Sequence, residues 1–104
     1  MEARFIEEVL YYTELFDFYG TLLTEKQQNY FKDYYFNNLS LSEIAENYEI
    51  TRNAIHNQLR EAKEKLEYYE KNLQLVDKQK KVKKIYLELT DEKAKKELKN
   101  LFDL

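Results

Sequence analysis

A chain of 104 residues has room for one compact domain with a single modest core. Hydrophobic residues make up 43% of the chain and charged residues 36%, so we expect a globular protein with a highly polar surface. The chain has no Cys, no Pro and one Gly, which excludes a disulfide framework, a thiolate metal site and collagen-like sequence, and disfavours tight β-hairpins.

No apolar run approaches the length of about 18 residues that a membrane span needs, and the chain does not start with a basic segment followed by a short apolar core. We therefore expect a soluble, cytoplasmic protein without membrane contact. The formal net charge is −3, but residues 1–50 hold three Lys or Arg against ten acids, whereas residues 51–104 hold fourteen against ten. This asymmetry fits two halves with opposite roles, or two halves that complement each other across a contact.

Residues 4–19 have the pattern of a first helix. Inward positions recur at three- and four-residue spacing, with glutamates between them, at Phe5, Ile6, Val9, Leu10, Thr13 and Phe16. Gly20 follows directly, and its position predicts that the helix ends in a left-handed cap.

Three hydroxyl residues predict the starts of three further helices. Thr24 and Ser40 each precede a Gln or Glu by three residues, which is the pattern of a capping box. Thr51 is the predicted N-cap of a helix that begins at Arg52. The first of these helices is expected to end near residues 37–38 and to bury Tyr30, Phe31, Tyr34 and Tyr35. The second is expected to be short and to bury Ile44, Ala45 and Tyr48.

From residue 52 onward a heptad stripe predicts one long helix. Its positions alternate steps of four and three at Ile55, Leu59, Ala62, Leu66, Tyr69, Leu73 and Val76. The stripe packs inward, forms a seam with a second copy, or does both. Residues 79–84 contain four lysines and are expected to form a basic connector. Thr90 is the predicted N-cap of a closing helix with the inner face Ala94, Leu98, Leu101 and Phe102.

The predicted fold class is therefore all-α: a small helical bundle with a long helix after a turn, and a C-terminal helix. We place a helix-turn-helix domain at residues 1–76. Residues 77–104 form the basic connector and the closing helix, packed on the same domain or on a dimer partner. A second surface for a homodimer is offered by Leu98, Leu101, Phe102 and Leu104.

The sequence gives little support to an enzyme. One His cannot form a histidine metal cluster, and one Gly cannot form a glycine-rich phosphate loop. Acidic pairs such as Glu7-Glu8 fall on helix positions that are predicted to face solvent. We expect no catalytic site, no cofactor and no metal.

Residues 39–63 have the pattern of a helix-turn-helix. Ile44 and Ala45 suit the point where two helices cross, Ile50 suits the turn, and Ile55 and Leu59 suit the inward face of the second helix. The side chains left to point outward can all bond to bases or phosphates: Arg52, Asn53, His56, Asn57 and Arg60. Two further phosphate contacts are predicted, at Thr51 with the first backbone amides and at Lys63. An alternative for Arg60 is a pair with Glu64, four residues on.

Three segments in a fixed order resemble a known family: LFDFY (15–19), LTEKQ (23–27) and LSLSEIAE (39–46). They are similar to the YlxM-like family of small bacterial proteins, whose helix-turn-helix resembles region 4 of sigma factors. The resemblance covers about residues 5–75, and it implies a regulatory role associated with the signal recognition particle. Such turns commonly carry Gly where this chain has Glu49, and a left-handed non-glycine residue costs on the order of 1 kcal/mol.

The sequence leaves three functions open. The first is a DNA-binding regulatory protein that uses the outward face of the second helix. The second is a protein-interaction adaptor whose acidic half meets a basic partner, such as a component of the signal recognition particle. The third is RNA binding through a cluster of lysines, which equally suits a solvated connector: Lys78, Lys80, Lys81, Lys83 and Lys84.

Overall fold

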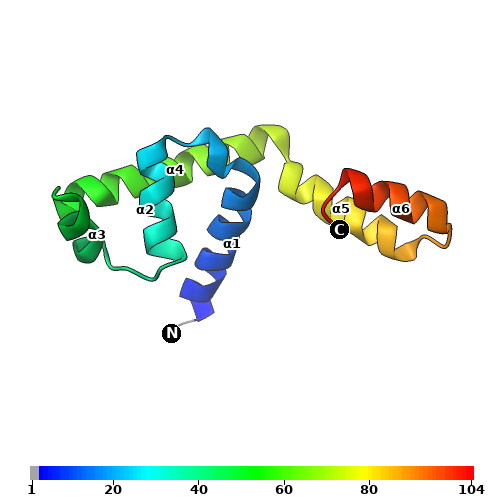
Figure 1. Cartoon of the computed structure of the whole chain (residues 1–104), viewed down its shortest axis with the longest axis horizontal. Coiled ribbons are helices and arrows are strands. Elements are labelled where there is room, and N and C mark those ends of the chain that lie inside the picture. The colour runs from blue at the N-terminus through cyan, green and yellow to red at the C-terminus, as the bar shows by residue number, and fades with distance from the viewer. Residues whose placement is uncertain (1–2) are drawn as a thin grey trace. The chain divides into compact units, whose positions relative to one another are not determined.

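A computed structural model describes residues 3–104, and every regular element in this range is a helix, as the sequence predicts (Figure 1). The elements are α1 (Ala3–Tyr19), the 3₁₀ helix η1 (Gly20–Leu22), α2 (Glu25–Tyr35), α3 (Leu41–Tyr48), α4 (Arg52–Leu73), α5 (Leu75–Glu88) and α6 (Glu92–Leu101). The chain divides into an N-terminal unit, Met1–Leu73, and a C-terminal unit, Gln74–Leu104. None of the helices between residues 3 and 104 combines the length and hydrophobicity that crossing a bilayer requires.

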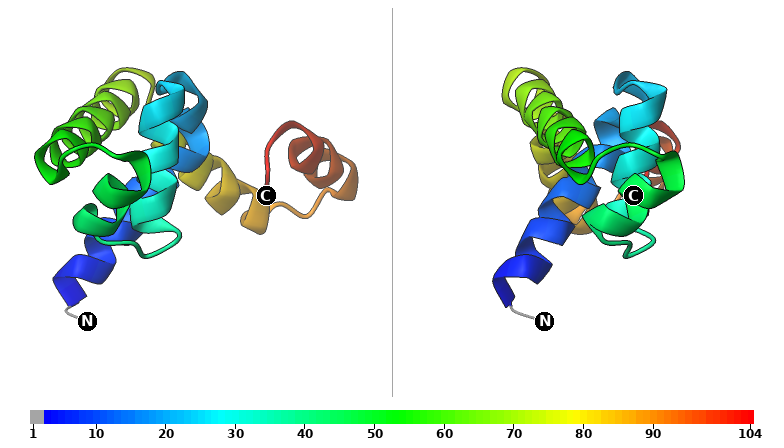
Figure 2. Two further views of the ribbon diagram at one scale, coloured as in Figure 1. Left: turned by 60° about the vertical axis from the view of Figure 1, so that its left-hand side comes forward. Right: turned by 90° about the vertical axis from the view of Figure 1, so that its left-hand side faces the viewer.

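In the N-terminal unit, α4 is the helix against which the other three pack (Figures 1 and 2). Figure 1 shows α1, α2 and α3 on one side of α4, with α3 nearest to its N-terminal end. The first four positions of the heptad stripe are buried: Ile55, Leu59, Ala62 and Leu66. This part of the stripe therefore packs inward and supplies one wall of the unit's own core.

The opposite wall of the core is aromatic. Phe31 of α2 is fully buried, and its ring stacks on Phe16 of α1 with 4.4 Å between ring centroids. Tyr35 lies on Phe31 with a centroid distance of 4.5 Å. Tyr19 is buried at the end of α1, where its hydroxyl donates to a carboxylate oxygen of Glu70 on α4 at 2.6 Å. Aromatic pairing thus joins α1 to α2, and a buried phenol joins α1 to α4.

The predicted helix starts are confirmed by their hydrogen bonds. The hydroxyls of Thr24 and Ser40 accept from the backbone N–H three residues on, at 3.2 and 3.1 Å. The side chains at those third positions, Gln27 and Glu43, accept in return from the cap backbone. The hydroxyl of Thr51 accepts from the N–H of Ala54 at 3.1 Å. These local bonds fix where α2, α3 and α4 begin.

The first helix ends directly before Gly20, as predicted, but the predicted left-handed cap is wrong. Gly20 is not left-handed; it opens the 3₁₀ helix that follows α1. It is buried, and a Cβ atom at this position would meet the Phe16 ring at 2.9 Å. Glycine is needed here because an aromatic ring covers the backbone, and the 3₁₀ turn absorbs the change of direction.

The expected continuation of the long helix to Val76 is also wrong. α4 ends at Leu73, and Gln74 adopts a left-handed conformation with φ 54°. Leu73 is 44% exposed, whereas Val76 is buried within α5. The heptad spacing is continuous in the sequence, but two separate helices carry it.

Three details of the C-terminal unit differ from the prediction. The expected basic connector is helical, because residues 79–84 lie inside α5. The N-cap of α6 is Asp91 rather than Thr90; its carboxylate accepts from the N–H groups of Lys93 and Ala94 at 2.9 and 3.3 Å. Leu101 is 76% exposed, so it is not part of an inner face.

Within the C-terminal unit, α6 turns back along α5 (Figure 1). The Lys95 ammonium lies 5.0 Å from the centroid of the Tyr86 ring. Near the chain end, the Gln79 side chain donates to the backbone oxygen of Asp103 at 2.9 Å. These contacts join α6 and the residues after it to α5.

Candidate nucleic-acid interface

The turn between α3 and α4 is three residues long and closed by backbone hydrogen bonds. Glu49 ends α3 in the left-handed conformation, with φ 56° and ψ 41°. Its N–H donates to the oxygen of Glu46 at 3.3 Å, and the N–H of Ile50 donates to the oxygen of Ala45 at 3.0 Å. This pair of bonds is a Schellman motif, which usually has Gly at the left-handed position. The prediction that Glu49 stands in the place of a turn glycine is confirmed.

The crossing of α3 and α4 is built from the residues that the pattern predicts. Ile44 and Ala45 on α3 are buried, and so are Ile55 and Leu59 on α4. The small side chain of Ala45 allows the two helices to approach closely. This crossing fixes the rotation of α4 about its axis, and it therefore determines which side chains face away from α3.

Four of the predicted contact residues are exposed on the first turns of α4: Arg52, Asn53, His56 and Arg60. Three of them recur at four-residue spacing, so they form one row along the helix, with Asn53 beside it. Asn57 is half-buried, at the edge of this face. Thr51 is exposed at the helix start, where its oxygen already accepts from Ala54. We call Arg52, Asn53, His56 and Arg60 the outer face of α4.

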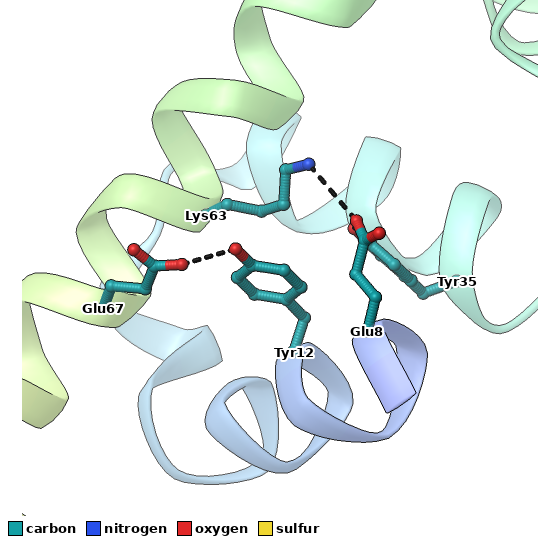
Figure 3. Close-up of polar contacts among 5 residues, drawn as sticks. All are labelled: Glu8, Tyr12, Tyr35, Lys63 and Glu67. Atoms are coloured by element: carbon teal, nitrogen blue, oxygen red, sulfur yellow. Dashed lines mark hydrogen bonds and ion pairs between the residues drawn. The ribbon is translucent and has the colours of Figure 1, made fainter. Parts of the chain in front are cut away.

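Lys63 does not lie on the outer face of α4. Its ammonium is 3.7 Å from a carboxylate oxygen of Glu8 on α1 and 5.4 Å from the centroid of the Tyr12 ring (Figure 3). Figure 3 shows the lysine directed toward Glu8 of α1, with the Tyr12 ring beside the lysine and the Tyr12 hydroxyl directed toward Glu67. The hydroxyl of Tyr12 donates to Glu67. Spacing along the chain could not reveal this group, because Tyr12 and Glu67, like Glu8 and Lys63, lie 55 residues apart.

Two phenols beside Lys63 are held in their neutral form. Burial raises the pKa of Tyr12, with a further contribution from its hydrogen bond to Glu67. Burial also raises the pKa of Tyr35, whose hydroxyl lies 3.5 Å from a Glu8 oxygen, and the Glu8 charge adds to the shift. Both phenols therefore remain hydrogen-bond donors at neutral pH. They join α1 to its neighbours and present no charge to a ligand.

Arg60 pairs within its own helix, as one of the two alternatives predicts. Its Nε lies 3.9 Å from a Glu64 carboxylate oxygen, and the two side chains are 58% and 68% exposed. An exposed pair at i,i+4 contributes only about 0.3–0.5 kcal/mol. A phosphate can therefore displace Glu64 at little cost, and the pair does not remove Arg60 from the outer face.

The N-terminal unit that carries this face is negatively charged overall. The N-terminal unit contains eight Lys or Arg against fourteen Asp or Glu, whereas the C-terminal unit contains nine against six. The outer face thus presents two guanidinium groups on a unit of net charge −6. In residues 3–104, no three His, Asp or Glu side chains are arranged to hold a metal ion.

A short helix, a closed three-residue turn and a longer helix with polar side chains on its outer face define the class of this chain: it is a helix-turn-helix protein. The model of the family described as "UPF0122: Putative helix-turn-helix protein, YlxM / p13 like" matches residues 6–103. The chain belongs to this family, which confirms the resemblance seen in its sequence.

Bacterial relatives match over much or nearly all of the chain. A UPF0122 protein of Malacoplasma penetrans (strain HF-2) is 47% identical over 77 residues, which cover 74% of this chain and 72% of the relative. One of Shouchella clausii (strain KSM-K16) is 45% identical over 73 residues, covering 70% and 67%. One of Geobacillus sp. (strain WCH70) is 40% identical over 101 residues, covering 95% and 92%. The similarity to this last relative therefore extends into the C-terminal unit.

Proposed function

We propose that the chain is a DNA-binding regulatory protein that inserts the first turns of α4 into the major groove of duplex DNA. The observation that carries this proposal is the outer face of α4: four exposed hydrogen-bonding side chains on a helix whose start and rotation are fixed. A helix of this kind matches the width of the major groove, and donor side chains on its first turns reach base edges.

The chemistry of each side chain suggests its role. Arg52 and Arg60 suit phosphate oxygens or the acceptors of guanine, and Asn53 suits the paired donor and acceptor of adenine. His56 lies between the arginines and is placed to contact a base edge. The hydroxyl of Thr51 accepts from Ala54, so its proton remains free to donate to a phosphate at the helix start.

The net charge of −6 predicts weak binding, and the number of arginines on the outer face sets how strongly that binding depends on salt. Two arginines that each neutralise one phosphate give a salt slope of about −1.8 on a double-logarithmic plot. The proposal leaves out Lys63, because Glu8 and the Tyr12 ring already hold its ammonium. Asn57 is kept as a contact at the edge of the face.

The proposal is tested by titrating salt against binding to random duplex DNA, with signal recognition particle RNA measured beside it. The test variant is the pair Arg52→Glu and Arg60→Glu, and the matched control is Lys71→Glu. Lys71 is exposed on the same helix, about 16 Å beyond Arg60 along the axis. We expect the double variant to lose duplex binding and the control to keep it. If neither nucleic acid binds near physiological salt, the proposal is wrong.

The family resemblance adds to this proposal a role in the signal recognition particle pathway. A second candidate function, a protein-interaction adaptor, is favoured by the negative charge of the N-terminal unit, which suits a basic partner. The two functions predict different sensitive residues. Reversing Glu7, Glu8 and Glu14 impairs an adaptor and spares a DNA reader, whereas reversing the two arginines does the opposite.

A homodimer is part of the proposal, and its support comes from the C-terminal unit. Leu101 is 76% exposed and Phe102 is 38% exposed, so apolar side chains are available at the end of the chain. Sedimentation of the whole chain tests this contact. A Leu101→Gln variant is expected to sediment as a monomer where the parent chain sediments as a dimer.

A further inference from the structure

An apolar groove lies between α1 and the end of α2, away from the residues proposed to contact DNA. Its volume is about 250 Å³, and it is lined by Phe5, Ile6, Val9, Leu10, Tyr34, Tyr35 and Asn38. Ile6 and Leu10 are 43% and 62% exposed. We call this site the α1–α2 groove.

The groove is more than a scatter of exposed apolar residues. Phe5, Ile6, Val9 and Leu10 are spaced so that they form one continuous stripe on α1. Two tyrosines of α2 form the facing wall. Contiguous exposed apolar surface on a soluble domain marks an interaction site more often than isolated apolar residues do. A volume of about 250 Å³ is smaller than most small-molecule sites, which favours protein side chains as the occupant.

The charge on α1 indicates what kind of partner fits. Apart from Arg4 in its first turn, the charged residues of α1 are all acids: Glu7, Glu8, Glu14 and Asp17. Glu7 and Glu8 lie in the sequence between the groove-lining residues Ile6 and Val9. Two copies of this face would repel each other, whereas a cationic partner would be attracted. The wall beside Glu8 is already ordered, because Lys63 and Tyr35 both contact its carboxylate. A partner helix would therefore meet a preformed surface with a negative edge.

We propose that the α1–α2 groove docks a basic amphipathic helix of another protein. The apolar side of that helix packs on the stripe of α1, and its flanking Lys or Arg side chains face the acids of α1. The proposal assigns a site and a partner chemistry to the adaptor function, on which it rests. It does not depend on DNA binding by α4.

The probe is a synthetic 18-residue peptide with Leu at helical spacing and Lys elsewhere, labelled with a fluorophore. Its binding to the whole chain is followed by fluorescence anisotropy. One control peptide replaces every Lys by Glu, and a second scrambles the Leu positions. We expect the basic amphipathic peptide alone to bind, and its affinity to fall as salt rises.

The variant Leu10→Gln tests the groove itself, and Leu22→Gln is its matched control. Both leucines are mostly exposed, at 62% and 53%, so neither change disturbs the core, and Leu22 lies beyond the opposite end of α1. Leu10→Gln is expected to weaken peptide binding by about tenfold, which is the effect of losing roughly one buried leucine contact. Leu22→Gln is expected to leave it unchanged. Duplex DNA binding is expected to be unaffected by either change.

Each remaining outcome overturns the proposal in a distinct way. Equal binding of the acidic or scrambled peptide, or no binding at all, shows that the groove does not select this chemistry. If Leu10→Gln instead converts a dimer of the chain into a monomer, the occupant is a second copy. If reversing Glu7, Glu8 and Glu14 abolishes peptide binding while Leu10→Gln does not, the adaptor function stands and its site lies elsewhere.

Discussion

Glu49 is a residue whose type is poorly suited to its backbone conformation. It is left-handed, with φ 56°, in a turn whose hydrogen bonds are those of a Schellman motif. A left-handed conformation costs a residue with a Cβ atom about 1–2 kcal/mol. Glycine has no such penalty, but it loses about 0.5–1 kcal/mol more chain entropy on folding. We therefore expect Glu49→Gly to stabilise the N-terminal unit by about 0.5–1 kcal/mol.

The effect is measurable by thermal unfolding followed through tyrosine near-ultraviolet circular dichroism. Nine of the ten tyrosines lie in the N-terminal unit and the chain has no Trp, so this signal reports mainly on the unfolding of the N-terminal unit. For a domain of this size, 1 kcal/mol corresponds to about 4–8 °C in Tm. Glu49→Gly is expected to raise Tm by about 2–8 °C.

Two controls separate backbone strain from other causes. Glu49→Gln removes the charge and keeps the strain, so it is expected to change Tm by much less than Glu49→Gly. Asn38 has nearly the same φ, 55°, but Asn tolerates this region, so Asn38→Gly is expected to bring no gain. If Glu49→Gly brings no gain, or if Glu49→Gln matches it, the reasoning from strain is wrong.

Two further substitutions, and a rise in pH, are expected to destabilise the unit. Gly20→Ala forces a Cβ to within 2.9 Å of the Phe16 ring, and urea unfolding should show a loss of about 1–3 kcal/mol. Gln27 is 2% exposed and bonds to two side chains of α4, so Gln27→Leu should cost about 1–3 kcal/mol in the same assay, and an unchanged midpoint would contradict this role. The pKa values of Tyr12 and Tyr35 are raised by folding, so the stability they contribute is complete below pH 10, the unfolded value, and falls as pH rises above it. A variant with Phe in place of both Tyr12 and Tyr35 should lose less stability as the pH rises above 10, as measured by the midpoints of urea unfolding across the pH range.

The helix starts were predictable because the information that specifies them is local. Thr24, Ser40 and Thr51 each bond to a backbone group three residues away, so sequence spacing alone identifies them. The rotation of α4 was predictable for a similar reason, since the helical period separates the buried row of Ile55 and Leu59 from the outer face.

Other features depended on contacts that spacing does not reveal. Gly20 is required by the Phe16 ring above it rather than by its backbone dihedral angles. The heptad stripe continues through Gln74, but a left-handed residue divides it between two helices. Lys63 has the right helical position for a phosphate contact, yet Glu8, far away in the sequence, holds its ammonium. Tertiary partners of this kind are invisible to a periodic pattern.

The most direct test of the central claim compares the salt dependence of duplex DNA binding in the parent chain and in the variant Arg52→Ala with Arg60→Ala. If α4 contacts phosphates through these two guanidinium groups, the variant binds more weakly, and the plot of log affinity against log salt becomes shallower by about 1.8. The control Lys71→Ala should leave both values unchanged. An unchanged slope in the double variant would contradict DNA binding through the outer face of α4.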